Sequence, residues 1–569
     1  MYSLNFLKPI LTARELIIDY GVRPFDICQN TKVWVFIKSL YLVTFVYSNL
    51  FIAFKIHKYL FKYNKKNKEI RDKSPNVLST LKENIMDKKN KHKYLCEQNE
   101  ITSELSLLVG YEKNTNEKIY IPESGLYQNF LITGTIGSGK TSSAMYPFTE
   151  QLIKYNSQNL KNKIGMLILD VKGNYYSYVK NLTEKYNISQ DLYVIELKSN
   201  IKYNPLHKPK LKPIVLANRL KTILELFSEN NSESYWLDKA EQIIAEAIKL
   251  CRIYNDGYVT FNEIHKIVTV KDYYKEKIYI LKNKFYSNSL NLEQVYELNT
   301  ALDFFQSEFE SLDDRTLSIL KSEITRITNV FISDYDVLKT FSPKKEDLTF
   351  TGFSDIIKDG KMVVLNMNIA EYKNLSKIIA AYLKLDFQSE IMMNLSNRNI
   401  KTTAFICDEY SEYVTKTDSD FFALSREAKC INIVSTQSYS SLKNTLRDDT
   451  KVKVLCQNLI NKIWFRTDDL YTIEETQKQI GKEDKEKISR NISENAKETE
   501  YNYLKKVFAN KDSSISESVN LYTQNDYIYD TNYFTQKLET FKALCFLSTG
   551  KNILKPKELE MYPYFLNKN

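Results

Sequence analysis

A short glycine-rich loop places the strongest constraint on this chain of 569 residues. Residues 134–141 read GTIGSGKT and fit the pattern GxxxxGK[ST]. The preceding residues 129–133 (NFLIT) predict a short buried strand, and residues 141–153 (TSSAMYPFTEQLI) predict a helix. Glycines let such a loop curl so that its backbone N–H groups face a phosphate at the positive end of the helix. The strand, loop and helix together predict a nucleotide site in an α/β domain.

The residues of this loop have expected parts in binding. We expect Lys140 to neutralise the charge of the β- and γ-phosphates, and the Thr141 hydroxyl to be a Mg²⁺ ligand. A glycine-rich turn without a ligand is the alternative. The residues predicted to surround the nucleotide phosphates are Gly134, Thr135, Ile136, Gly137, Ser138, Gly139, Lys140 and Thr141.

A nucleotide-hydrolysing site of this kind also needs a distant carboxylate, and two apolar stretches end in acid. One is residues 164–170, which ends in Asp170, and the other is residues 404–407, which Asp408 and Glu409 follow. The second fits better, because Asp408 can hold Mg²⁺ through water while Glu409 polarises the attacking water. Asp170 fits a turn or helix-capping residue equally well.

Two further polar residues follow this acidic pair. Residues 421–429 predict a helix, and residues 430–435 predict the next buried strand, which ends at Thr436-Gln437-Ser438. Gln437, at the tip of a strand beside the acidic pair, is placed to sense a γ-phosphate. Arg426, on the predicted helix, is placed to reach the nucleotide of a neighbouring subunit, although an Arg on an amphipathic helix more commonly faces solvent.

Nearly all of the net charge of +10 lies in the N-terminal region. Residues 1–100 hold 18 Lys and Arg against 9 Asp and Glu, whereas the remainder holds 62 against 61. Basicity is therefore no argument for DNA binding. Residues 33–54, with Lys38 as the only charge, predict a transmembrane helix, and the basic residues after it keep the bulk of the chain cytoplasmic. This predicts a single-pass protein of the cell membrane; a buried helix of a soluble domain is the alternative.

The remaining pattern predicts the division into domains. An amphipathic segment (1–32) precedes the transmembrane helix, and a basic juxtamembrane linker (55–100) follows it. Strands alternate with helices on both sides of a strand-poor helical stretch, which predicts a RecA-like P-loop NTPase with a parallel doubly wound sheet and an inserted all-α domain. The ATPase domain is expected at 101–206 and 351–569, the inserted domain at 207–350, and a polar surface insertion at 483–530. Seven scattered Cys without CxxC spacing predict neither disulfides nor a zinc site.

The order of these segments resembles the type IV secretion coupling proteins, the TraG/TraD-type ATPases of conjugative DNA transfer. Besides the P-loop helix with Pro147, the resemblance is carried by LILDVKGNYY (167–176), YNPL (203–206), SYWLDKAEQIIAEAI (234–248), the strand and helix of 358–383, FICDEYSEY (405–413), SREAKCINIVSTQSYSSL (425–442), residues 459–481 and KPKELEMYPYF (555–565). Val171 and Asn174 depart from the family's Asp-Pro-Lys-Gly-Glu motif, which weakens any catalytic role for Asp170.

The resemblance implies a function and a set of roles. ATP and Mg²⁺ would be bound by Lys140 and Thr141, with Asp408 and Glu409 as the Walker B pair. Arg426 would be an arginine finger acting on the neighbouring subunit, and Gln437 the sensor. The implied partners are single-stranded DNA, the relaxase or relaxosome, components of a type IV secretion channel, the membrane, and further copies of the chain in a homo-hexamer. Members of the family commonly have two membrane spans, whereas this sequence predicts one.

Other functions stay open from the sequence. One is a double-stranded DNA translocase of the septal type, although no C-terminal winged-helix unit is recognisable. Another is a non-motor receptor that binds ATP structurally and recruits protein, although such a receptor has no need of Glu409. A protein-only substrate is also compatible with the neutral charge of the motor half.

Overall fold

The computed structural model describes residues 35, 39, 40, 104–226, 234–286, 290–367, 369–372, 374–396, 399–495, 500–502, 507–509 and 514–567. The chain divides into two compact units, residues 1–94 and 95–569, and the fold described here is that of the second. The segments predicted at 1–32, 33–54 and 55–100 lie outside the described residues apart from Val35, Ser39 and Leu40. In the part of the chain that the structure describes, no helix is long and apolar enough to cross a membrane.

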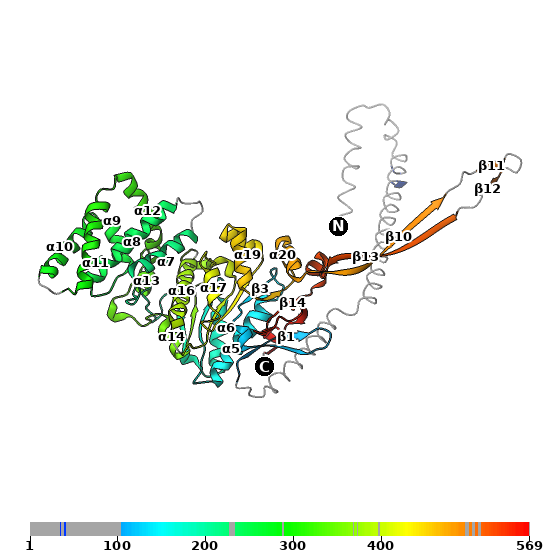
Figure 1. Cartoon of the computed structure of the whole chain (residues 1–569), viewed down its shortest axis with the longest axis horizontal. Coiled ribbons are helices and arrows are strands. Elements are labelled where there is room, and N and C mark those ends of the chain that lie inside the picture. Colours follow the sequence, from blue (N-terminus) through cyan, green and yellow to red (C-terminus); the bar gives the residue numbers. More distant parts are fainter. Residues whose placement is uncertain are drawn as a thin grey trace, which may run out of the picture. The chain divides into compact units, whose positions relative to one another are not determined.

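A sheet of eleven strands, in the order β2-β1-β15-β14-β9-β3-β8-β7-β4-β6-β5, forms the centre of the second unit (Figure 1). The seven strands from β9 to β5 are parallel, and the other four pair antiparallel. The strand bounds are Ser106–Glu112 (β1), Lys118–Pro122 (β2), Phe130–Thr133 (β3), Gly165–Leu169 (β4), Leu192–Ile195 (β5), Met362–Leu365 (β6), Thr403–Cys407 (β7), Cys430–Thr436 (β8), Asn461–Trp464 (β9), Lys542–Phe546 (β14) and Lys557–Glu560 (β15).

The RecA-like α/β fold is therefore present, and seven of its strands are parallel as predicted, whereas four antiparallel strands that the sequence did not predict extend the sheet at one edge. The connection from β1 to β2 is only residues 113–117, and that from β14 to β15 is residues 547–556. A parallel connection needs a dozen residues or more, usually with a helix. The short connections therefore pair β1 with β2 and β14 with β15 antiparallel, and these four strands extend the parallel part of the sheet at one edge.

The parallel strands are apolar because helices cover both of their faces. In β7, Ala404 and Ile406 join one hydrophobic core, whereas Phe405 and Cys407 join the other. The first core includes residues of α5 and α6, and the second includes residues of α14, α16, α18 and α19. These helices are Tyr146–Gln158 (α5), Asn174–Lys185 (α6), Phe353–Asp359 (α14), Asn374–Met393 (α16), Tyr439–Leu446 (α18) and Asp449–Asn458 (α19); short or peripheral helices are Glu123–Leu126 (α4), Ile369–Tyr372 (α15), Asp418–Leu424 (α17) and Leu470–Ile480 (α20).

A group of helices separates β5 from β6 in the sequence. Side-chain caps set where several of them begin, because a capping oxygen accepts N–H groups that the first helical turn leaves free. Thr260 forms a capping box with Glu263, and Asp313 accepts from two N–H groups of the next helix. The helices are Pro213–Leu226 (α7), Ser234–Tyr254 (α8), Phe261–Thr269 (α9), Tyr273–Tyr286 (α10), Leu292–Asp303 (α11), Asp314–Ile332 (α12) and Tyr335–Phe341 (α13). The exact domain boundaries 101–206, 207–350 and 351–569 stay predictions.

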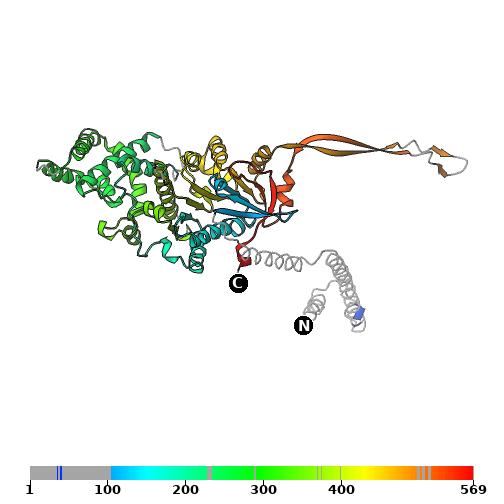
Figure 2. The same cartoon turned by 60° about the horizontal axis from the view of Figure 1, so that its bottom comes forward.

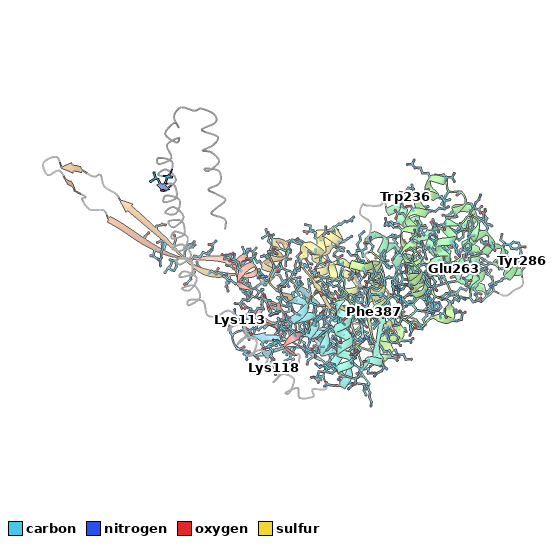
Figure 3. The ribbon with its side chains drawn as sticks, turned by 180° about the vertical axis from the view of Figure 1, so that it is seen from behind. Lys113, Lys118, Trp236, Glu263, Tyr286 and Phe387 are labelled. Carbon is cyan, nitrogen blue, oxygen red and sulfur yellow. The ribbon has the colours of Figure 1, made fainter. Side chains whose placement is uncertain are left out.

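A buried ionic cluster joins these helices to the sheet. Asp386 of α16 is fully buried and pairs with Lys208 at 2.7 Å and with Arg219 of α7 at 2.8 Å. The Tyr203 hydroxyl donates to the same carboxylate at 2.7 Å. The two cations hold the pKa of Asp386 below its usual range against the effect of burial. Figure 3 shows Phe387, the next residue, between the helical group and the sheet, where its ring packs against Phe353 at 5.2 Å.

The predicted polar insertion contains a long β-hairpin, formed by β10 (Lys482–Asn495) and β13 (Ser514–Tyr527) and followed outward by β11 (Glu500–Asn502) and β12 (Val507–Ala509). The hairpin projects from the end of α20 (Figure 2). Ile488 and Leu521 face each other across it and are both exposed. A ribbon of two strands exposes both faces, so its sequence lacks the alternation of apolar and polar residues that marks a half-buried strand.

Candidate nucleotide site

The glycine-rich loop follows β3 and is fixed between the ends of two neighbouring strands. The Gly134 N–H donates to the Gln437 carbonyl beyond β8 at 3.2 Å, and the Thr135 N–H donates to the Arg466 carbonyl beyond β9 at 2.9 Å. Gly134 has φ of +155°, and a Cβ there would lie 2.6 Å from Phe465. The loop therefore needs glycine at this point, both for its backbone angle and for the close approach of β9.

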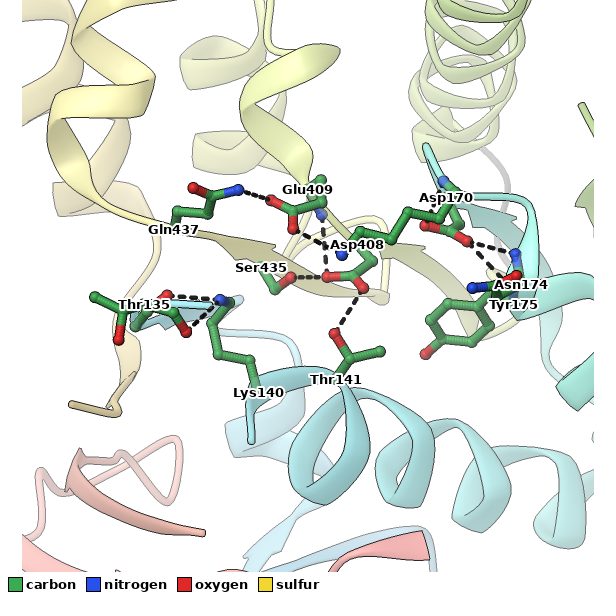
Figure 4. Close-up of polar contacts among 12 residues, drawn as sticks. Thr135, Lys140, Thr141, Asp170, Asn174, Tyr175, Asp408, Glu409, Ser435 and Gln437 are labelled. Carbon is green, nitrogen blue, oxygen red and sulfur yellow. Dashed lines mark hydrogen bonds and ion pairs between the residues drawn. The ribbon is translucent and has the colours of Figure 1, made fainter. Parts of the chain in front are cut away.

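Lys140 is positioned inside the curl of this loop (Figure 4). Its ammonium donates to the carbonyl of Gly134 at 2.5 Å and to that of Thr135 at 3.3 Å. The side chain is buried, and burial lowers the pKa of Lys140 while the nearby Glu409 and Asp408 carboxylates oppose that shift. A buried cation held only by carbonyls can exchange them for phosphate oxygens, which pair with it more strongly.

Asp408 and Thr141, far apart in the sequence, meet at this site. The Thr141 hydroxyl donates to Asp408 Oδ2 at 2.8 Å, and the Ser435 hydroxyl of β8 donates to Oδ1 (Figure 4). The Glu409 N–H also donates to Oδ1, at 3.1 Å. Hydroxyl and carboxylate oxygens are the ligands that Mg²⁺ prefers. The donor set at Thr141 and Asp408 therefore fits the predicted Mg²⁺ position.

Glu409 points back over the loop from an unusual backbone conformation. Its φ of 49° and ψ of 46° are left-handed, which is uncommon for a residue other than glycine and often marks a functional site. Its carboxylate accepts from Lys172 Nζ at 3.2 Å and from Gln437 Nε2 at 3.4 Å. Gln437 thus lies next to the acidic pair, as expected for a residue at the tip of β8.

Lys172 and Ser435 were not predicted from the sequence. Lys172 reaches Glu409 because β4 lies next to β7 and both strands end at the same edge of the sheet. Ser435 reaches Asp408 because β8 is the other neighbour of β7. The order of the strands in the sheet was the only signal that could have identified these two residues. The ends of neighbouring parallel strands lie side by side, so residues that follow them come into contact.

Asp170 stabilises the start of α6. Its carboxylate accepts the N–H groups of Lys172 at 3.1 Å, Asn174 at 3.0 Å and Tyr175 at 3.2 Å. Burial raises the pKa of Asp170, and the Asp408 carboxylate adds to that increase. These bonds are those of a turn and helix-capping residue, one of the two interpretations that the sequence left open.

Arg426 lies away from these residues, and its predicted place on a helix is wrong. α17 ends at Leu424, and Arg426 is exposed in the turn that leads to Cys430 at the start of β8. The helix ends because Ser425 turns inward, where its hydroxyl donates to Asn129 Oδ1 at 3.1 Å. The loop of residues 134–141 follows the other ends of these parallel strands. Arg426 therefore lies at the opposite sheet edge from Lys140 of its own subunit.

A contact from the C-terminal strands also holds the loop. The Phe541 N–H donates to the Ser138 carbonyl at 3.2 Å, and a Cβ at Gly139 would lie 2.7 Å from the Phe541 ring. The Ser138 hydroxyl is buried and has no hydrogen-bond partner within the described residues. A buried hydroxyl without a partner is costly, and a ligand in the loop would satisfy it.

Comparisons with known proteins concern the family and the fold of the chain. Residues 402–526 match the family model described as the TraM recognition site of TraD and TraG. A solved structure of the bacterial conjugative coupling protein TrwB, in an unbound form, matches with a TM-score of 0.52 at 10% identity, over 79% of this chain and 88% of that chain. TrwB in complex with ADP and Mg²⁺ matches with a TM-score of 0.52 at 10% identity, over 80% and 95%.

TrwB in complex with sulphate matches with a TM-score of 0.52 at 12% identity, over 80% of this chain and 94% of that chain. No curated protein sequence matches the chain at a significant level. Together, the matches confirm the resemblance to TraG/TraD-type coupling proteins over residues 402–526, and they confirm the RecA-like α/β fold. The roles predicted for the individual site residues stay predictions.

Proposed function

We propose that this chain is a coupling ATPase that recruits single-stranded DNA, or a DNA–relaxase conjugate, and moves it to a type IV secretion channel. The contact between Thr141 and Asp408, at 2.8 Å and beside Glu409, is the observation that carries the proposal. It supports the proposal because a nucleotide-hydrolysing site would need a hydroxyl and two carboxylates at one sheet edge. The match of residues 402–526 to a TraM recognition model supports recruitment of a relaxosome protein, and the TrwB complex with ADP and Mg²⁺ supports a nucleotide and a metal as ligands.

The residues at the loop bind and orient the nucleotide. Lys140 would leave the Gly134 carbonyl to contact phosphate oxygens, and the buried Ser138 hydroxyl would gain a partner. Thr141 and Asp408 would hold Mg²⁺, which neutralises phosphate charge when bound. Ser435 fixes the Asp408 carboxylate through its hydrogen bond, so Asp408 is oriented before any ligand arrives.

Glu409 would accept a proton from the attacking water. Its two carboxylate oxygens are held by Lys172 and Gln437, so the carboxylate is oriented by groups on the strands to either side of β7. Arg426 lies too far from its own nucleotide to act there. Within a homo-hexameric ring it would contact the nucleotide of the next subunit and stabilise γ-phosphate charge. Residues 33–54 would anchor this ring in the cell membrane as a single span, with the ATPase in the cytoplasm.

Steady-state ATP hydrolysis by the full chain in detergent, with and without single- or double-stranded DNA, tests this function. We expect single strands to raise the rate several-fold. Lys140→Ala and Glu409→Gln should each lower it about a hundredfold or more. The matched controls are Lys180→Ala and Glu184→Gln, which change exposed residues of α6.

The other outcomes separate the competing functions. Stimulation by duplex alone would indicate a double-stranded DNA translocase. Nucleotide binding without hydrolysis under every condition would indicate a receptor. Hydrolysis by Glu409→Gln at the rate of the parent would contradict the role of Glu409 as the proton acceptor.

A further inference from the structure

A cavity of about 560 Å³ lies on one face of the sheet, away from the nucleotide site. Its floor includes Lys462 of β9 and Phe546 of β14, which are opposite each other in the register of these two strands. Its walls come from α18, α19 and α20, and α18 contacts both of the other helices. Figure 1 shows α19 and α20 over this part of the sheet. The nucleotide loop contacts β9 at its other end, beyond Trp464.

Lys462 is an unusual residue to find at the floor of this cavity. Its side chain lies on the same face of β9 as Trp464, which belongs to a small apolar core with Ile473 and Phe534. Lys462 is only 5% exposed. Besides burial, only Cys456 affects the pKa of its ammonium, so no carboxylate of the described residues lies close to it. Burial lowers the pKa of Lys462 to about 8, so the amine still carries its charge at neutral pH.

The other titratable groups that line the cavity do not supply a counter-charge. Burial raises the pKa of the Cys456 thiol to about 12, and burial also raises the pKa of Tyr439 and Tyr471, so all three are neutral. The Glu475 carboxylate accepts from Lys478 at 2.9 Å. Buried charges in proteins are normally paired. The ammonium of Lys462 therefore has no counter-charge among these residues, and a bound anion would supply one.

The residues that line the cavity restrict which kind of anion can bind there. Val452, Ile460, Phe546 and Ile553 make much of the lining apolar. A single amine among apolar walls suits one carboxylate attached to an apolar body, because a phosphate dianion would keep most of its charge unpaired there. Two further cations mark the opening: Lys453 and Lys478 line the cavity, and their side chains are 53% and 56% exposed. They would contact acidic residues of a chain that leads out of the cavity.

We propose that this cavity binds the C-terminus of a partner protein, with the free α-carboxylate paired to Lys462 and an apolar last side chain against Phe546 and Tyr471. Acidic residues before it would lie near Lys453 and Lys478. The site is separate from the ATPase, and the assay below contains no nucleotide. Its failure would therefore leave the proposed ATP hydrolysis untouched.

The test measures binding of two fluorescein-labelled peptides, both Glu-Asp-Glu-Asp-Leu-Phe, to the full chain by fluorescence anisotropy. One peptide has a free C-terminal carboxylate and the other is amidated. We expect the free acid to bind at least about tenfold more tightly than the amide, as for a charge-assisted hydrogen bond. Its affinity should fall as pH rises above about 8, where unliganded Lys462 loses its proton.

Lys462→Met should remove the preference for the free acid, whereas Lys453→Gln and Lys478→Gln should weaken both peptides only modestly. The melting temperature of Lys462→Met should equal or exceed that of the parent, because the substitution removes an unpaired buried charge; this separates lost binding from lost folding. Equal binding of acid and amide, binding unchanged by Lys462→Met, or no binding of either peptide would overturn the proposal. So would displacement of the peptide by inorganic phosphate or an oligo-dT strand but not by 3-phenylpropionate, since the site would then prefer phosphate.

Discussion

At the scale of single residues, the Glu409 carboxylate depends on two side chains from neighbouring strands. Lys172 and Gln437 hold its two oxygens, and Glu409 itself has a left-handed backbone. The P-loop and the acidic pair were predictable because each is a local pattern of chemistry at a strand end. Lys172 was not, because its only link to Glu409 is the adjacency of β4 and β7.

Lys172→Met tests this dependence. The ammonium lies 3.2 Å from Glu409, but its own side chain is largely exposed, so we expect a loss of orientation and not of folding. We predict that kcat for ATP falls several-fold while KM changes little, as for an interaction that serves the chemical step. Steady-state kinetics provide the measurement, with Lys180→Met of α6 as the control. A rise in KM at unchanged kcat would place Lys172 in nucleotide binding instead.

At the scale of elements, buried charges join helices and strands around the central sheet. Lys384 of α16 and Asp418 of α17 are both fully buried and lie 2.6 Å apart. Tyr410, the residue after Glu409, donates to the same Asp418 carboxylate. The parallel strands were predictable from their apolar runs. The antiparallel strands were not, because β15 (KELE) has no apolar pattern of its own and gains its place through the short connection from β14.

Lys384→Met should lower the free energy of unfolding by about 3–5 kcal/mol, because it leaves Asp418 buried and unpaired. Urea denaturation measures this effect. Lys377, also on α16, forms a partly exposed pair with Glu412, and Lys377→Met should cost less than about 1 kcal/mol. Lys384→Met/Asp418→Leu should recover part of the loss. Equal losses of stability in Lys377→Met and Lys384→Met would contradict this prediction, because burial of the Lys384–Asp418 pair would then make no difference to stability.

Lys462 of β9 should make stability depend on pH. Its pKa falls on folding from 10.5 to about 8. Between these values the unfolded chain binds more protons than the folded chain, so stability rises with pH, and the cost of the buried charge is complete below pH 8. The stability that Lys462→Met gains over the parent should therefore be larger at pH 7 than at pH 10.5, by about 3 kcal/mol. Urea denaturation at both pH values tests this; a gain that is independent of pH would contradict the assigned pKa.

At the scale of the whole molecule, Asp386 of α16 fixes the helices between β5 and β6 to the layer that covers the sheet, through Lys208, Arg219 and Tyr203. The helical character of this stretch was predictable from its periodicity. The ionic junction was not, because Asp386 lies more than a hundred residues from its three partners, and each charged member alone resembles an ordinary surface charge.

Asp386→Asn tests the junction. Loss of the carboxylate charge leaves two buried cations without their counter-ion, so we expect faster amide exchange in α7 and residues 203–208 than in the parent. Hydrogen–deuterium exchange measured by mass spectrometry provides this map. Asp347→Asn, which removes a partly exposed pair with Lys202 at 3.6 Å, is the matched control. Exchange that rises equally everywhere would indicate a general loss of stability instead of a local junction.

The central claim is that ATP hydrolysis at the Lys140, Asp408 and Glu409 site moves single-stranded DNA. The most direct measurement is displacement of streptavidin from the biotinylated end of a single-stranded oligonucleotide by the full chain in detergent. We expect displacement with ATP and Mg²⁺, none with ADP, and none by Glu409→Gln although that variant still binds the strand. ATP hydrolysis that responds to single strands without any displacement from either end would contradict this claim.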